Sequence, residues 1–76
     1  MSNSVRFTIK PLPTGIIYVL QVRKSCEAAV AESWLADRGI QTTFKLRGWW
    51  YEASWQDSPA AQEVAPLLQA RASEER

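Results

Sequence analysis

Histidine is absent from the 76-residue chain, and glycine is scarce, with three residues. Without histidine the sequence contains no Ser–His or Cys–His nucleophile pair, and it lacks the usual ligands of a zinc site. Three scattered glycines cannot form the glycine-rich loop that cradles a phosphate group. The sequence therefore predicts a protein that is not an enzyme and that uses no cofactor, metal or small-molecule substrate.

Cysteine is limited to one residue, Cys26, which cannot form a disulfide within the chain. This favours a cytoplasmic protein. Cys26 follows Arg23 and Lys24 at the start of a predicted helix, a setting that can activate a thiol. No base or second thiol accompanies it, so we expect a small half-buried side chain and not a nucleophile. Apolar runs of about 18 residues are also absent, and we expect no membrane-spanning segment.

Aromatic residues are concentrated in residues 44–55, which contain three of the four tryptophans. Aromatic side chains favour strands, and Gly48 can supply the positive φ of a tight turn, so this stretch predicts a β-hairpin. A loop at 47–48 or at 45–48 separates an apolar face from a polar one, whereas a three-residue loop places cations among the aromatics. We favour the first two loops. They place Phe44, Trp49, Tyr51, Ala53 and Trp55 on one face and Lys45, Trp50, Glu52 and Ser54 on the other.

Apolar periodicity predicts four strands and two helices. The strands span about residues 5–10, 16–23, 41–46 and 49–55, and the helices span about 26–38 and 59–73. Ser25 and Ser58 are the predicted N-caps, and Gly39 is the predicted terminator of the first helix. Pro66 predicts a kink or a break in the second helix, because an internal proline removes a hydrogen bond and costs about 3 kcal/mol.

The order ββαββα predicts one α+β domain over residues 1–76. We expect a two-layer sandwich, in which a four-stranded, mainly antiparallel sheet of two hairpins has both helices on one face. The buried helical positions are predicted to be Val30, Ala31, Trp34 and Leu35 in the first helix and Val64, Leu67 and Leu68 in the second.

The net charge is +1, so the chain as a whole has no strong attraction for nucleic acid or membrane. Cations are nevertheless concentrated in the predicted strands. The sheet face away from the helices should carry Arg6, Thr8, Lys10, Ile17, Val19, Gln21, Arg23, Thr43, Lys45, Trp50, Glu52 and Ser54. Lys45 is predicted to form a cation–π pair with Trp50. Ile17, Val19 and Trp50 should form an apolar centre with a polar rim, which is typical of an interface.

Two functions follow from this predicted face. We expect a small non-enzymatic binding protein that associates with a protein partner or with itself, because Ile17 and Val19 suit a dry contact. The alternative is binding of single-stranded RNA or DNA, with Trp50 stacking on bases and cations holding phosphates. The residues predicted to contact the partner are Arg6, Lys10, Ile17, Val19, Arg23, Lys45, Arg47 and Trp50. The size and plan are compatible with an accessory or inhibitor protein of a phage or mobile element, by analogy alone.

Overall fold

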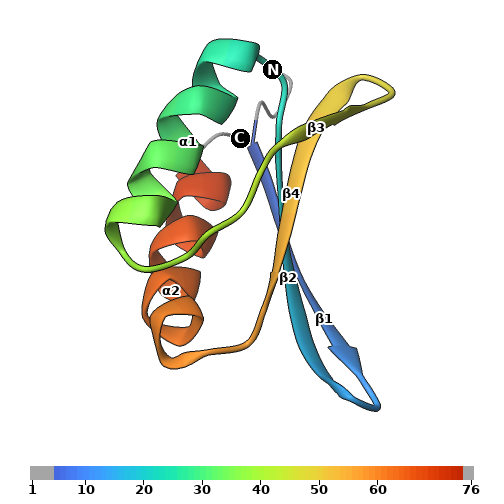
Figure 1. Cartoon of the computed structure of the whole chain (residues 1–76). Helices are drawn as coiled ribbons and strands as arrows, with labels where there is room; N and C mark the ends of the chain where they lie inside the picture. The colour runs from blue at the N-terminus through green and yellow to red at the C-terminus, as the bar shows by residue number, and fades with distance from the viewer. Residues whose placement is uncertain (1–4, 75–76) are drawn as a thin grey trace.

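A computed structural model describes residues 5–74 and has two layers, with both helices on one face of a single sheet (Figure 1). In chain order the elements are β1 (Val5–Leu12), β2 (Gly15–Val22), α1 (Ser25–Asp37), β3 (Lys45–Arg47), β4 (Trp50–Gln56) and α2 (Pro59–Glu74). This arrangement confirms the predicted ββαββα order, the four-stranded sheet and the α+β class.

The sheet has the strand order β1-β2-β4-β3, and every neighbouring pair is antiparallel. The central strands β2 and β4 are each followed by a helix, while β1 and β3 form the edges. Each half of the chain therefore contributes an edge strand, a central strand and a helix, and the two ββα units occupy equivalent places in the fold.

The first hairpin pairs β1 with β2 along their whole length, around a turn formed by Pro13 and Thr14. Proline suits the first corner of such a turn because its ring fixes φ near the required value. Side chains of a strand alternate between the two faces of the sheet. In β2, Tyr18, Leu20 and Val22 accordingly point toward the helices and are buried.

The second hairpin turns at Gly48 and Trp49, because Arg47 pairs with Trp50. Gly48 has a φ of +62°, which suits the first central position of a type II′ turn, where glycine is favoured. The predicted two-residue loop at 47–48 is therefore one residue too early. When the loop moves by one residue along the chain, the cross-strand partner of each residue moves by two residues. The side chains of both strands therefore stay on their predicted faces.

The approach to β3 is irregular, and the strand predicted over 41–46 begins four residues later than expected, at Lys45, and ends at Arg47. Side-chain hydrogen bonds replace strand pairing here. The Thr42 hydroxyl donates to the carbonyl of Ser54 at 2.9 Å, and the Phe44 N–H donates to a carboxylate oxygen of Glu32 at 3.3 Å. These bonds fasten the connection to β4 and to α1 without making it part of the sheet.

The end of α1 confirms the predicted terminator. Gly39 has a φ of +88°, and its neighbour Ile40 donates its N–H to the carbonyl of Leu35 at 2.9 Å. This is the long hydrogen bond of a Schellman motif, and both apolar partners, Ile40 and Leu35, are buried in the core.

The start of α1 differs from the prediction. Ser25 is the first helical residue, and the capping position is Lys24, which makes no side-chain capping hydrogen bond. The carbonyl of Lys24 already accepts the N–H of Ala28 at 3.0 Å, so the helical hydrogen bonds begin one residue earlier than expected. The predicted Ser25 N-cap is therefore wrong.

Helix α2 begins as predicted, with Pro59 as its first residue and the Ser58 hydroxyl accepting the N–H of Ala61 at 3.0 Å. The helix continues through Pro66, so the predicted alternative of a break is wrong. Pro66 is exposed, and water can therefore reach the backbone carbonyl that it leaves without a donor. Packing of the opposite side of the helix on the sheet offsets the cost.

The core lies between the sheet and the two helices, and each helix buries a stripe at the spacing of helical turns. The stripe residues are Ala28, Ala31 and Leu35 on α1 and Ala61, Val64, Ala65 and Leu68 on α2. The predicted burial of Val30 and Leu67 is wrong, because these side chains are 69% and 54% exposed. Alanine supplies two of the three stripe residues on α1 and two of the four on α2.

Candidate binding face

The sheet face opposite the two helices is not covered by another layer of the described residues, and we call it the open face (Figure 1). Its side chains are Arg6, Thr8 and Lys10 of β1, Ile17, Val19 and Gln21 of β2, Arg23 just after β2, Lys45 and Arg47 of β3, and Trp50, Glu52 and Ser54 of β4. All eight residues predicted to contact a partner therefore lie on one face. Thr43, which was expected beside them, lies outside the sheet.

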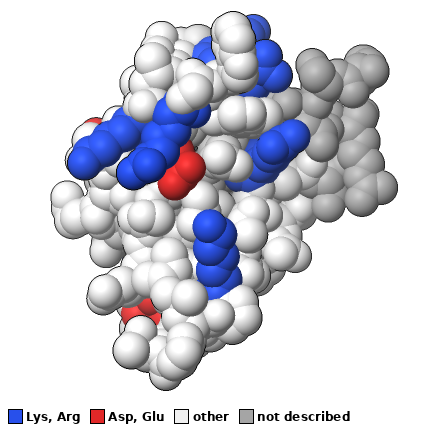
Figure 2. Space-filling model, turned by 90° about the vertical axis from the view of Figure 1, so that its right-hand side faces the viewer, with Lys and Arg blue, Asp and Glu red and all other residues white. Residues whose placement is uncertain are grey.

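Basic side chains gather on the open face, and Figure 2 shows most of them over its upper half. The face carries five cations and one carboxylate, a formal charge of +4 in a chain whose total is +1. All five cations are exposed, while Glu52 is half-buried and accepts a hydrogen bond from the amide of Gln21 at 3.3 Å. The charge is strongly polarised, since the open face is positive and the rest of the chain is negative.

One row of polar side chains crosses all four strands. In it Arg6 lies opposite Gln21, Gln21 lies opposite Glu52, and Glu52 lies opposite Lys45. Neighbouring strands are about 4.8 Å apart, so the two cations at the ends of the row are separated by roughly 14 Å. The row therefore offers two separated positive groups, with a hydrogen-bonded amide–carboxylate pair between them.

Trp50 lies on the open face, in agreement with its predicted position on the polar face of the hairpin. The guanidinium carbons of Arg6 and Arg23 lie 4.5 Å and 5.2 Å from the centroid of its ring, within cation–π distance. The predicted pairing of Trp50 with Lys45 is wrong, because the register places Lys45 opposite Glu52. The strand order instead brings arginines from β1 and from the end of β2 to the indole.

The expected apolar centre of the face is largely hidden. Val19 is only 7% exposed and Ile17 is half-buried, although both side chains lie on the open face. Thr8 and Ser54 flank Val19 on the neighbouring strands. The prediction of an exposed apolar patch is therefore wrong for Val19, and the face presents cations, hydroxyl groups and a partly covered indole.

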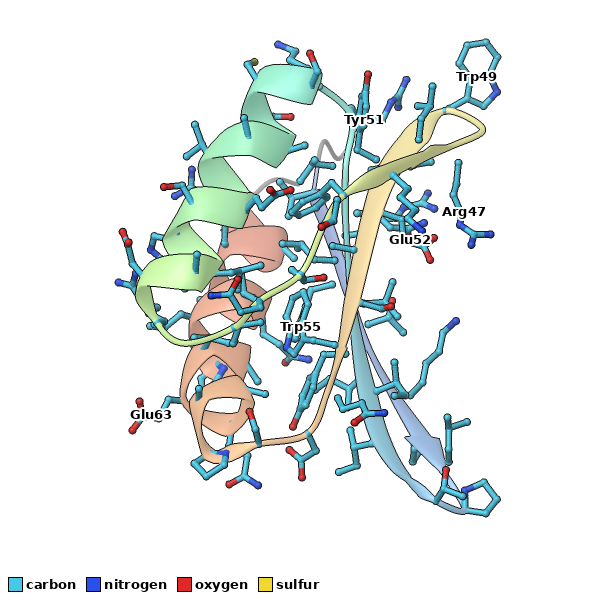
Figure 3. The ribbon with its side chains drawn as sticks, viewed as in Figure 1. Arg47, Trp49, Tyr51, Glu52, Trp55 and Glu63 are labelled. Carbon is cyan, nitrogen blue, oxygen red and sulfur yellow. The ribbon has the colours of Figure 1, made fainter. Side chains whose placement is uncertain are left out.

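Trp49 is the aromatic residue whose position differs most from the prediction. It is 82% exposed and projects from the tip of the β3–β4 turn, away from the core (Figure 3). In the same view Arg47 and Glu52 point away from the helices, whereas Trp55 lies between the layers. The signal in the sequence was Gly48, because glycine at the first central position of a type II′ turn places the next residue in the loop.

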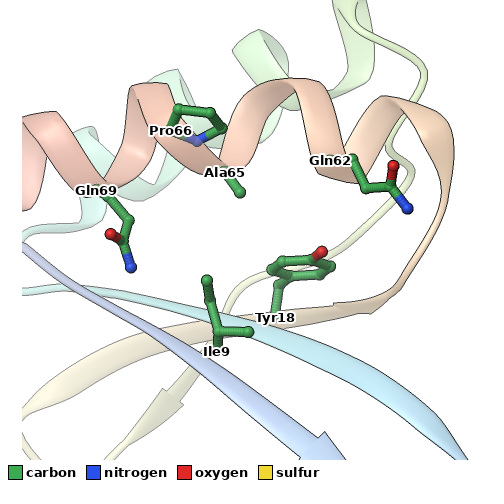
Figure 4. Close-up of a pocket in the computed structure, with 6 residues that line it drawn as sticks. All are labelled: Ile9, Tyr18, Gln62, Ala65, Pro66 and Gln69. Atoms are coloured by element: carbon green, nitrogen blue, oxygen red, sulfur yellow. The ribbon is translucent and has the colours of Figure 1, made fainter.

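An open groove lies between the first hairpin and α2 (Figure 4). It has a volume of about 370 Å³ and is lined by Ile9, Tyr18, Gln62, Ala65, Pro66 and Gln69. These side chains include no carboxylate, cation or thiol, and the titratable group among them is the phenol of Tyr18, whose hydroxyl donates a hydrogen bond to Asp57. Within the described part of the chain, no group of three or more His, Cys, Asp and Glu side chains could hold a metal ion.

The Tyr18 hydroxyl beside this groove should make stability depend on alkaline pH. It donates a hydrogen bond to Asp57 at 2.9 Å, and this bond, together with burial and the negative charge of Asp57, raises the pKa of Tyr18 above its ordinary value of about 10. The folded state holds this proton more tightly than the unfolded state, so the contribution to stability is complete below about pH 10 and is lost as the pH rises through the folded-state pKa.

We therefore expect the free energy of unfolding to fall above about pH 10, and to fall less in a Tyr18→Phe variant. Urea denaturation of both proteins across this range measures the difference. Parallel pH profiles for the two proteins would contradict the assignment.

No helix among residues 5–74 is long and apolar enough to cross a lipid bilayer. Comparison of the chain with protein families, with curated proteins and with solved structures finds no match.

Proposed function

We propose that the protein is a non-enzymatic binding protein whose open face docks a negatively charged macromolecular partner. The observation that carries the proposal is the concentration of five exposed cations and one carboxylate on the face that the helices leave uncovered. A field of one sign over a broad surface attracts and orients a partner of the opposite sign. The negative charge of the remaining surface favours one orientation of approach.

The same charge disfavours association of the protein with itself through this face. Two copies stacked face to face would bring ten cations together, and like charges across an interface cost several kcal/mol. Pairing along the edge strand β1 is also disfavoured, because Lys10 and Pro11 lie on it and lysine and proline are features that protect sheet edges. Of the two associations expected from the sequence, the geometry supports a partner other than a second copy.

A pair of charge reversals tests the proposal. Arg47→Glu changes a cation on the open face, and Arg71→Glu makes the same change on α2, in the other layer. With heparin as a general polyanion, we expect Arg47→Glu to weaken binding at least about tenfold, because charged hydrogen bonds at a docking site are worth about 1.5–3 kcal/mol. Arg71→Glu should weaken binding less than about twofold, because this residue lies outside the docking face. Calorimetric titration measures both. Equal losses would show that net charge alone governs binding and would contradict a docking face.

A further inference from the structure

We infer that the partner of the open face is a single-stranded nucleic acid, an inference that rests on the proposed docking function. Phosphate groups supply the negative charge that the exposed cations require, but an acidic protein could supply it as well. The groups that distinguish the two partners are planar: an indole with two guanidinium groups beside it on the face, and a second indole at its margin. Unpaired bases stack on aromatic rings and on guanidinium planes.

The first planar group is the cluster of Trp50 with Arg6 and Arg23. Both guanidinium carbons lie within 5.2 Å of the ring centroid, so the indole restricts two long side chains that would otherwise move freely. Arg47 lies opposite Trp50 on β3 and is exposed. Two arginines thus lie over the ring and a third lies opposite Trp50 on the neighbouring strand. Each can contact a phosphate, while a stacked guanidinium offers its flat side to a base.

The second planar group is Trp49, which is 82% exposed at the tip of the β3–β4 turn (Figure 3). The side chains of Arg47 and Trp50, which pair across the strands on either side of this turn, both lie on the open face. The exposed ring leaves its flat surface accessible, so an unpaired base can stack on it. A strand that crosses the cationic face and passes the turn would meet two stacking groups that are adjacent in the chain, Trp50 on the face and Trp49 at its margin.

A protein partner fits the face less well. Protein interfaces have an apolar core surrounded by a polar rim, whereas here Val19 is buried and Ile17 is half-buried among polar and cationic side chains. A duplex also fits less well, because the flat faces of its bases are already stacked and cannot stack on the aromatic and guanidinium groups of the protein. Single strands expose both the charge and the base surfaces that the open face matches.

Fluorescence anisotropy with four labelled probes tests the inference. The probes are a mixed-sequence RNA and DNA of about 12 nucleotides, the DNA duplex of the same sequence, and polyglutamate of similar length. We expect the single strands to bind most tightly, with a slope of log affinity against log salt of about −2 to −3.5 for three to five phosphate contacts. Trp49→Ala should weaken single-strand binding at least about fivefold and duplex or polyglutamate binding less than about twofold.

The outcomes separate this inference from the proposal beneath it. One outcome would overturn the nucleic acid as partner: polyglutamate binds more tightly than the oligonucleotides, Arg47→Glu abolishes this binding, and Trp49→Ala does not affect it. The docking face would then stand, with an acidic protein as its partner. Equal loss of single-strand and duplex binding in Trp49→Ala would overturn the role of stacking. Binding of none of the probes would overturn both. Because Trp49 is so exposed, the variant should unfold at the same urea concentration as the natural protein.

Discussion

Replacing Trp55 with alanine should lower the free energy of unfolding by about 3–5 kcal/mol. Trp55 is 7% exposed and lies on the core face of β4, near the C-terminal end of the strand. Its ring packs against those of Phe7 and Tyr18 at centroid distances of 6.3 Å and 6.4 Å. A chain of this length is stable by about 4–11 kcal/mol in total. The loss would therefore remove a large fraction of the stability, and urea denaturation followed by circular dichroism measures it.

Trp55→Phe is the matched control for this substitution. Phenylalanine keeps a ring in the core and removes the indole nitrogen, which is buried and has no hydrogen-bond partner among the described residues. We expect a loss of about 1–2 kcal/mol, clearly smaller than for alanine. An alanine variant whose free energy of unfolding lies within about 1 kcal/mol of that of the natural protein would contradict the buried position of this ring in the core.

Replacing Trp50 with alanine should have the opposite balance of effects, because its side chain points from the other face of the same strand. The change removes the ring that Arg6 and Arg23 contact, and two exposed cation–π contacts are worth about 1–2 kcal/mol together. Binding should suffer more: base–aromatic stacking is worth about 1–3 kcal/mol, so the dissociation constant for a single-stranded oligonucleotide should rise about 5- to 150-fold.

The comparison of the two variants is informative because both make the same chemical change on β4. Trp55→Ala should mainly lower the free energy of unfolding, whereas Trp50→Ala should mainly lower the affinity for the oligonucleotide while the protein remains folded. A Trp50→Ala protein that unfolds as readily as Trp55→Ala would place the ring in the core and contradict the open face. One that binds normally would show that the indole has no part in docking.

The features that the sequence predicts correctly depend on local chemistry or on alternation. Ser58 followed by Pro59 starts α2, and Gly39 followed by an apolar residue ends α1, because caps are determined by a few consecutive residues. The outward position of Trp50 follows from the alternation of side chains between the two faces of a strand. The prediction of this position holds although the turn was placed one residue too early, because that error shifts each cross-strand pair by two residues and leaves every side chain on its face.

The features that the sequence does not predict depend on contacts between distant segments. The arginines beside Trp50 come from β1 and from the end of β2, and only the strand order β1-β2-β4-β3 brings them to the ring. Val30 has a good helical position for burial, but the sheet meets α1 along Ala28 and Leu35 instead. Val19 becomes buried because it lies on a central strand with neighbours on both sides.

The four tryptophans allow the central claim to be tested in one experiment, because they lie in four different environments. Trp50 lies on the open face and Trp49 on the turn beside it, Trp55 lies in the core, and Trp34 lies on α1 with the guanidinium carbon of Arg38 at 3.8 Å from its ring. Heteronuclear NMR resolves the indole N–H signal of each. When a single-stranded oligonucleotide is added, the signals of Trp49 and Trp50 should move while those of Trp34 and Trp55 stay in place. Movement of the Trp34 signal with Trp50 unchanged would show that the helical layer binds the probe, and would contradict the account.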